Sequence, residues 1–255
     1  MTLFLIGIGL FDERDITLRG LDAIKSCHKV YLESYTSILQ VGNDRLEKLY
    51  GKEIILADRA IVEQKAESTI LADAKEGDVA FLVIGDPFSA TTHADLVQRA
   101  KKAGIKVEII HNASILNAVG EVGLELYKFG KTTSVPYPHE GFRPRTPYDV
   151  IKVNARIGMH TLVLLDLRPD ENRFMSVGEA LTYISSIEGL RQEKVLTAKT
   201  PIIGCARLGS PDPSIVYGPA GKVIEADLGK PPHCIIVPGK LHFVEEEMLE
   251  RFGLE

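Results

Sequence analysis

Short, mainly apolar runs that stop at glycine or at polar residues recur along the first half of the chain. The runs are 3–8, 30–32, 79–84 and 105–110. A short apolar run bounded by turn residues is typical of a strand buried on both faces. The segments between the runs have helical spacing, including one expected helix over 62–74. Alternating strands and helices predict an α/β fold with a mostly parallel sheet.

The run 79–84 is the strongest predicted strand, and it ends at Gly85-Asp86-Pro87. Thr92 and Asp95 form a capping-box pattern that predicts a helix start. Because ligands of open α/β sheets bind outside the carboxyl ends of strands, Asp86 is the first candidate functional residue. Gly, Asp and Pro are also ordinary turn formers, and spacing alone leaves a plain turn equally well supported.

Two further helices are expected in this half. One begins near Thr17 and is expected to place Leu18, Leu21 and Ile24 on one face. The other follows the strand at 105–110, and Ser114 can cap it.

The alternation breaks between residues 124 and 147, where four prolines and two glycines predict a linker and a candidate lid. Beyond it, strands are expected at 161–167, 201–206 and 235–238. A second capping box, Ser176 with Glu179, predicts a helix to about residue 187. We therefore predict two α/β lobes, residues 1–123 and residues 124–255 with the Pro-rich linker 124–147.

Composition narrows the class of protein. The 255 residues carry a net charge of -5, and 45% are hydrophobic. Because apolar runs fall well short of the ~20 residues of a membrane helix, and because the N-terminus lacks a basic n-region, we expect a cytoplasmic protein without a membrane segment. The chain lacks a Lys/Arg-rich run, which argues against a nucleic-acid partner. The dispersed cysteines, Cys27, Cys205 and Cys234, predict reduced core residues.

Familiar catalytic layouts do not occur in the sequence. It contains neither G-x-S-x-G, nor a Walker loop, nor H-E-x-x-H, and the scattered histidines do not support a metal site. The glycine pair Gly7 and Gly9 is an incomplete dinucleotide fingerprint. What recurs is a set of strand ends with backbone-rich turns. Such turns suit a reaction in which a cofactor carries the chemistry and the protein orients the reactants.

Several blocks of the sequence resemble the archaeal diphthine synthases, and they cover essentially the whole chain. These blocks are Met1–Leu10, Asp15–Leu21, Glu33–Ser37, Gly85–Pro87 with Ala90–His93, Ser114–Ile115, Tyr127–Lys131, His160–Asp166, Ala206–Ser210, Pro231–His233 and Pro238–His242. Gly-Asp-Pro alone indicates only the wider tetrapyrrole-methylase-like superfamily. The Thr-Thr-His, Tyr-Lys-Phe-Gly-Lys and Pro-Gly-Lys-Leu-His blocks narrow the resemblance to diphthine synthases.

The resemblance implies a specific activity. This family transfers methyl groups from S-adenosyl-L-methionine to the amino group of a 3-amino-3-carboxypropyl-histidine on translation elongation factor 2. The products are trimethylated diphthine and S-adenosyl-L-homocysteine. It also implies two lobes of tetrapyrrole-methylase type with the cofactor cleft between them, a homodimer, and no metal. The implied cofactor contacts are Leu10, Asp86, Ser89, Ser114, Ile115, Leu165, Leu208 and His233. Ser89 stands where a small apolar residue is common.

Some points stay open at this level. The sequence does not assign a general base, although His93 and His233 are the nearest candidates by motif. Arg143 and Arg145 either dock the protein substrate or are merely solvated. The number of methyl groups and the esterification of the carboxylate are undetermined. Alternative functions are a methyltransferase of the same fold acting on a corrinoid precursor or ribosomal RNA, and a non-catalytic cofactor-binding homologue.

Overall fold

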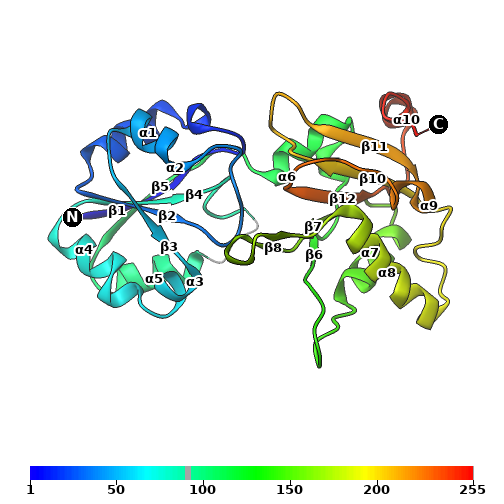
Figure 1. The fold of residues 1–255 in the computed structure, drawn as a ribbon, viewed down its shortest axis with the longest axis horizontal. Helices are drawn as coiled ribbons and strands as arrows, with labels where there is room; N and C mark the ends of the chain where they lie inside the picture. The colour runs from blue at the N-terminus through cyan, green and yellow to red at the C-terminus, as the bar shows by residue number, and fades with distance from the viewer. Residues whose placement is uncertain (90–92, 255) are drawn as a thin grey trace. The chain divides into compact units, whose positions relative to one another are not determined.

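The chain folds into two compact units, Met1–Ala118 and Val119–Glu255 (Figure 1). The structure is a computed structural model, and it describes residues 1–89 and 93–254. The division falls between two short helices, α6 (Ile115–Ala118) and η3 (Val119–Val122), shortly before the predicted boundary after residue 123.

The first unit is built on a five-stranded sheet whose paired strands all run parallel. In spatial order the strands are β3 (Ile54–Ala57), β2 (Lys29–Glu33), β4 (Val79–Val83), β1 (Thr2–Gly7) and β5 (Lys106–Ile110). The predicted central strand is β4, and all five of its residues are buried. The parallel sheet predicted from the apolar runs is confirmed.

Helices cover both faces of this sheet (Figure 1). They are η1 (Glu13–Asp15), α1 (Leu18–Ser26), α2 (Asn43–Tyr50), α3 (Arg59–Glu63), η2 (Ala66–Ser68), α4 (Ile70–Glu76), α5 (Ala94–Lys102) and α6. Alternate residues of β1 point to opposite faces. Leu5 packs in one core with residues of α4 and α5, whereas Ile6 packs in the other with residues of α1 and α2.

Two helix predictions in this unit are wrong. The segment 62–74 is not one helix, because a 3-10 turn around η2 separates α3 from α4. Leu18 does not share the buried face of α1, since it is 83% exposed while Ile24 is fully buried. Six residues of helix place these side chains ~120° apart. The predicted Thr92 cap lies outside the described residues, and α5 begins at Ala94.

The second unit contains a mixed sheet. In spatial order its strands are β11 (Ser214–Pro219), β10 (Pro201–Ala206), β12 (His233–Val237), β7 (Thr161–Leu165) and β6 (Thr133–Val135). β12 is antiparallel to both β10 and β7, and β6 is parallel to β7. β7 and β10 therefore end at the edge of the sheet where β12 begins.

The other elements of this unit surround the mixed sheet. They are η3, η4 (Leu126–Lys128), α7 (Thr146–Arg156), β8 (Leu167–Arg168), η5 (Pro169–Glu171), β9 (Arg173–Phe174), α8 (Val177–Arg191), α9 (Ala220–Val223) and α10 (Phe243–Glu250). The capping box of Ser176 and Glu179 is confirmed at the start of α8.

The segment 124–147 is not a linker. It contributes η4 and the strand β6, which pairs with β7. β6 has three residues, of which only Val135 is buried, so it leaves no recognisable periodicity in the sequence. Between β6 and α7 the chain forms an arm, residues 136–145, which extends away from the sheet (Figure 1). Residues 138–143 of the arm are exposed, whereas Tyr137 at its base is 3% exposed and packs in the core. His139 and Phe142 close the arm, with stacked rings 5.0 Å apart.

A buried carboxylate holds α10 to the rest of the second unit. Glu245 is fully buried and accepts hydrogen bonds from the Lys128 ammonium, from His160 Nε2 (3.0 Å) and from the backbone N–H groups of Glu125 and His242. Gly239 N–H donates to His160 Nδ1, so Nε2 carries the ring proton. Burial would raise the pKa of Glu245, but these donors outweigh it and lower the pKa to about 2.

The cysteines are buried, free thiols, as the sequence predicted. Cys27 follows α1 in the first unit. Cys205 and Cys234 are cross-strand partners on β10 and β12.

Candidate functional site

The carboxyl ends of β1, β4 and β5 lie at one edge of the first sheet, which we call the first rim. Hydrogen bonds join all three ends. Gly9 and Gly85 form an antiparallel bridge between the turns after β1 and β4. Asn112, just after β5, donates from Nδ2 to the carbonyls of Gly7 and Asp15, both at 2.9 Å. The rim is therefore a preorganised arrangement of backbone.

Asp86 lies at the centre of the first rim and is 5% exposed. Its Oδ1 accepts from Phe88 N–H (2.9 Å) and Ser89 Oγ (3.2 Å). Its Oδ2 accepts from His111 Nδ1 (2.7 Å) and Asn112 N–H (3.1 Å). These donors use both carboxylate oxygens for contacts within the protein. The structure thus gives Asp86 a positioning role in the rim.

Hydrogen bonds keep this carboxylate ionised. Burial would raise the pKa of Asp86, but the donors from Phe88, His111 and Asn112 hold it below its usual range. A fixed negative charge at the rim favours a cationic ligand in its vicinity.

The predicted cofactor contacts of the first unit all lie at this rim. Leu10 and Ser89 are partly exposed in the turns after β1 and β4. The backbone N–H of Leu10 donates to Asp15 Oδ2 at 3.0 Å. Ser114 Oγ accepts from Leu116 N–H, which places Ile115 at the start of α6. The rim therefore brings Leu10, Asp86, Ser89, Ser114 and Ile115 to one edge.

Two glycines allow the rim to close this tightly. A Cβ on Gly7 would lie 2.5 Å from the carbonyl oxygen of Gly85 and 2.8 Å from Asn112 Cβ. Gly85 has φ +81, which favours glycine. The sequence gives little indication that Asn112 and Asp15 organise the rim. Asn112 lies just after a strand, whereas Asp15 lies in η1 and meets the rim only in the folded chain.

The second unit has its own rim, where β7 and β10 end and β12 begins. The strand register pairs Ala206 with His233 and Leu164 with Cys234, so Leu165 and His233 lie at the same edge. Leu208 follows β10 and is 6% exposed. The three predicted contacts of this unit, Leu165, Leu208 and His233, are thus brought together.

Arg207 supports this second rim. Its N–H donates to Pro232 carbonyl at 2.9 Å, and its Nη1 donates to the carbonyls of Leu228 and Lys230. His233 Nε2 lies 3.0 Å from the carbonyl of Gly229 and must donate to it. Nδ1 of His233 is buried and has no hydrogen-bond partner among the described residues. Burial lowers the pKa of His233, which leaves Nδ1 as an unused acceptor.

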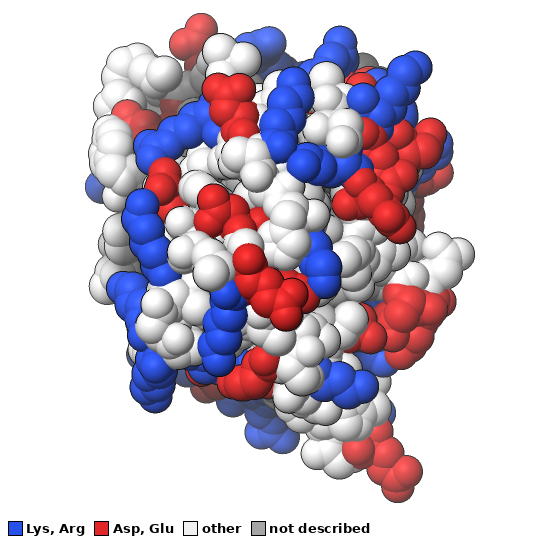
Figure 2. All heavy atoms as spheres, turned by 90° about the vertical axis from the view of Figure 1, so that its left-hand side faces the viewer, with Lys and Arg blue, Asp and Glu red and all other residues white. Residues whose placement is uncertain are grey.

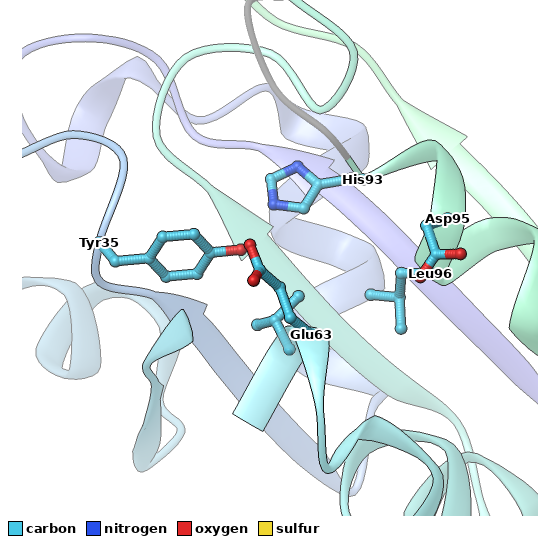
Figure 3. A pocket seen from close by; sticks show the side chains of 6 residues that line it. Tyr35, Glu63, His93, Asp95 and Leu96 are labelled. Carbon is cyan, nitrogen blue, oxygen red and sulfur yellow. The ribbon is translucent and has the colours of Figure 1, made fainter. Parts of the chain in front are cut away.

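A pocket of about 270 Å³ lies beside the first rim, within the first unit. Its lining residues are Tyr35, Val62, Glu63, His93, Asp95 and Leu96. Figure 3 shows the Tyr35 hydroxyl, the Glu63 carboxylate and the His93 ring facing this space. His93 Nδ1 lies 3.2 Å from the carbonyl of Pro87, so the ring is joined to the turn that carries Asp86.

Other classes of site find little support. Within residues 1–89 and 93–254, no group of His, Cys, Asp or Glu side chains is arranged to hold a metal ion. None of the described helices is long and apolar enough to cross a membrane. Positive and negative side chains are interspersed over the face of the first unit in Figure 2, instead of forming a basic stripe there.

Comparisons with known proteins agree with the resemblance seen in the sequence. The family model for tetrapyrrole (corrin/porphyrin) methylases matches residues 2–224. A probable diphthine methyl ester synthase of Arabidopsis thaliana is 48% identical over 97% of each chain. The diphthine methyl ester synthase of Homo sapiens is 45% identical over 99% of this chain and 95% of its own. The crystal structure of a putative diphthine synthase from Entamoeba histolytica matches with a TM-score of 0.92 and 41% identity, over 100% of this chain and 99% of the other.

Proposed function

Because the chain belongs to the tetrapyrrole methylase family and, within it, to the diphthine synthases, we propose its acceptor and product. Diphthine synthases are S-adenosyl-L-methionine-dependent methyltransferases of diphthamide biosynthesis. The acceptor is the 3-amino-3-carboxypropyl-histidine of translation elongation factor 2. The enzyme adds three methyl groups to the amino group and then one to the carboxylate. The product is a diphthine methyl ester, and each transfer releases S-adenosyl-L-homocysteine.

The observation that carries this proposal is the similarity, over nearly the full chain, to relatives that are all named diphthine methyl ester synthase. Diphthine methyl ester synthases from plant, fungal, amoebal and human sources are 44–49% identical to this chain and align with 97% of it or more. Their name specifies the ester. The sequence alone leaves esterification of the carboxylate undetermined, and this similarity favours it. The same relatives disfavour a corrinoid or ribosomal RNA acceptor.

Both rims suit parts of S-adenosyl-L-methionine. In the first unit the residues that would hold it are Leu10, Asp86, Ser89, Ser114 and Ile115, where the ionised Asp86 favours a cationic ligand. In the second unit they are Leu165, Leu208 and His233. The buried Nδ1 of His233 lacks a partner among the described residues, and an N–H donor from a ligand would satisfy it. Leu165 and Leu208 offer apolar contacts beside it.

The reaction needs little reactive chemistry from the protein. The bound cofactor supplies an electrophilic methyl group on a sulfonium. The protein holds the acceptor in line with that methyl group, and such positioning supplies roughly 7–11 kcal/mol of barrier lowering at best. Hydrogen bonds within the first rim hold its backbone rigid, which limits the reorganisation needed at each transfer.

The exposed part of the arm, residues 138–143 with Arg145, is the docking surface for the elongation factor. It presents Phe142, which is 43% exposed, together with the exposed Arg143 and Arg145. Arginines of this kind pair with carboxylates of a partner protein. The enzyme works as a homodimer in the cytoplasm, where translation factors act.

Mass spectrometry of elongation factor 2 tests this proposal. The factor carrying the 3-amino-3-carboxypropyl-histidine is incubated with the enzyme and cofactor. We expect a gain of four methyl groups, one of which is lost on mild alkaline treatment because only the ester hydrolyses. A factor without the 3-amino-3-carboxypropyl group serves as the control and should gain nothing.

Each alternative has its own result. A product that stops at three methyl groups and resists alkali contradicts the ester step. Methyl transfer to ribosomal RNA or to a corrinoid precursor, with none to the factor, contradicts the acceptor. Cofactor binding without any transfer indicates a non-catalytic homologue.

A further inference from the structure

One residue lining the pocket beside the first rim, His93, forms a buried ionisable pair with Glu33, and this pair has no role in the function proposed above. Glu33, the last residue of β2, is 1% exposed, and His93, just before α5, is 2% exposed. Glu33 Oε2 lies 3.9 Å from His93 Nε2 and accepts a hydrogen bond from Thr36 Oγ1 at 2.7 Å. Glu33 Oε1 is buried without a hydrogen-bond partner among the described residues. A buried carboxylate oxygen without a donor is costly, so it favours the arrival of a proton nearby.

The tautomer of His93 follows from its neighbours. The carbonyl of Pro87 can only accept, so Nδ1 of the neutral ring must carry the proton that it donates. Nε2 of His93 then carries the free lone pair. The His93 ring packs edge-on against the Phe81 ring, with centroids 5.3 Å apart, and this contact fixes the orientation of the imidazole. His93 is therefore a preoriented base beside a carboxylate.

The charges around the pocket favour a cation. Glu63 of α3 and Asp95 of α5 line it, and Glu33 Oε2 lies 3.9 Å from Nε2 of the lining His93. Two guanidiniums lie beside these lining residues. Nη1 of Arg99 lies 3.2 Å from Asp95 Oδ2 and donates to the carbonyls of Val62 and Glu63. The other guanidinium is that of Arg59. It stacks on the Tyr35 ring at 5.3 Å and lies 3.8 Å from the Glu63 carboxylate. Glu63 and Asp95 are thus each paired with a guanidinium, whereas Glu33 has no Lys or Arg within ion-pair distance among the described residues, and its carboxylate favours a protonated amine near His93.

The reaction needs such a base. An ammonium group has no lone pair, so the acceptor must lose a proton before each transfer to nitrogen. We propose that His93 is the general base of the amine methylations, that Glu33 positions and supports it, and that the pocket receives the acceptor's amino group. This inference rests on the proposed function and assigns part of its machinery.

The proposed step balances as follows. The ammonium N–H bond breaks and a new N–H bond forms at His93 Nε2, giving an imidazolium beside the Glu33 carboxylate. The amine lone pair then attacks the methyl carbon, the C–S bond breaks, and its electron pair stays on sulfur. The imidazolium returns its proton to solvent before the next round. Methylation of the carboxylate involves no such proton, because its oxygen is already anionic.

Burial shifts the pKa of each group at this site: it raises the pKa of Glu33, against which the hydrogen bond from Thr36 acts. Burial lowers the pKa of His93, so the ring is neutral and able to accept. Burial raises the pKa of Tyr35 to about 12, and Glu33 and Glu63 add to that shift. Tyr35 therefore keeps its hydroxyl proton.

The difference between nitrogen and oxygen acceptors gives a sharp test. His93→Asn keeps a side-chain N–H for the Pro87 carbonyl but removes the base. It is assayed on elongation factor 2 with the unmethylated side chain and on the factor with the trimethylated one. We expect amine methylation to fall by ~10²-fold or more, and ester formation to change little. Raising the pH should partly restore the amine steps, because solvent then deprotonates more of the acceptor.

The matched control is His28→Asn. His28 precedes β2 at the opposite end of the strand, is exposed, and has Nδ1 2.8 Å from the carbonyl of Asp78. It should leave both steps unchanged. Equal losses of amine and ester methylation in His93→Asn, or no loss in either, would overturn the assignment. If the wild-type enzyme makes no ester, the pH rescue decides: a variant whose amine steps stay slow at high pH refutes the base.

Glu33→Gln tests the supporting role separately. Loss of the carboxylate destabilises the imidazolium, so the acidic limb of the amine-methylation pH profile should move to lower pH and the plateau rate should fall. The pH profile and the plateau rate of ester formation should not change. A profile that keeps its position contradicts a role for Glu33 through His93. A wild-type enzyme that methylates neither acceptor refutes the proposed function itself, and the base assignment falls with it.

Discussion

Acid should weaken the second unit through a single buried carboxylate, Glu245. Its pKa falls from an ordinary 4.5 to about 2 in the folded chain. The folded state therefore binds the proton less readily than the unfolded state does. At pH 7 this difference stabilises folding by about 3 kcal/mol, from 1.36 kcal/mol for each pKa unit. The stabilisation is fully present above pH 4.5 and is lost as the pH falls towards 2.

The comparison variant is Glu245→Gln, which has a similar shape but cannot ionise. At neutral pH it should cost about 3–5 kcal/mol, because it leaves the partly buried Lys128 ammonium without its carboxylate. At pH 3 the wild-type carboxylate has lost about 2 kcal/mol of its contribution, so the gap between the two proteins should narrow by about that amount. Glu247→Gln, an exposed position on the same helix, is the control and should show neither effect.

Hydrogen exchange of the α10 amides, followed by mass spectrometry between pH 3 and 7, measures this gap within the second unit alone. Local exchange is preferable to a melting temperature, because two units need not unfold together. Exchange rates must be corrected for the intrinsic effect of pH. A gap between wild type and Glu245→Gln that stays constant down to pH 3 would refute the reasoning.

Three further predictions concern the first rim and the arm. Gly7→Ala should prevent or severely weaken folding, since its Cβ would meet the Gly85 carbonyl at 2.5 Å. Gly189→Ala, in the last turn of α8 where a Cβ meets open space, should be neutral or stabilising by up to ~1 kcal/mol, and thermal melting compares the two variants. Asp86→Asn should lower the unfolding free energy by about 1–3 kcal/mol and weaken cofactor binding, because a buried backbone donor loses its acceptor. Calorimetric titration with S-adenosyl-L-methionine measures the binding, and an unchanged affinity would contradict this prediction. Replacing both Arg143 and Arg145 by alanine should raise KM for elongation factor 2 several-fold without changing kcat or cofactor affinity, and a fall in kcat alone would contradict docking.

The sequence predicted the first unit better than the second. Buried parallel strands such as β4 are continuous apolar runs, and these are visible without any structure. In the second unit β11 is partly exposed along its whole length, and β6 has three residues, so neither produces a clear signal. The antiparallel placement of β12 depends on pairing across the unit, which local pattern does not encode.

The candidate site likewise has features that the sequence predicts and features that only the folded structure shows. Asp86 was predictable because it directly follows the strongest strand. The saturation of its carboxylate by His111 and Asn112 was not, since both donors come from another strand end and meet it only after folding. The pairing of Glu33 with His93 was likewise invisible, because it joins residues from two different strand-to-helix segments.

The reactivity of the buried thiols can report when the core of each unit opens. Cys27 belongs to the first unit, and Cys205 and Cys234 belong to the second. Burial raises the pKa of Cys27 to about 11 and that of Cys205 well above its usual value, so a thiol reagent attacks either one only after the surrounding core opens. Alkylation followed by peptide mass analysis thus reads the opening of each unit from one sample, without an introduced label.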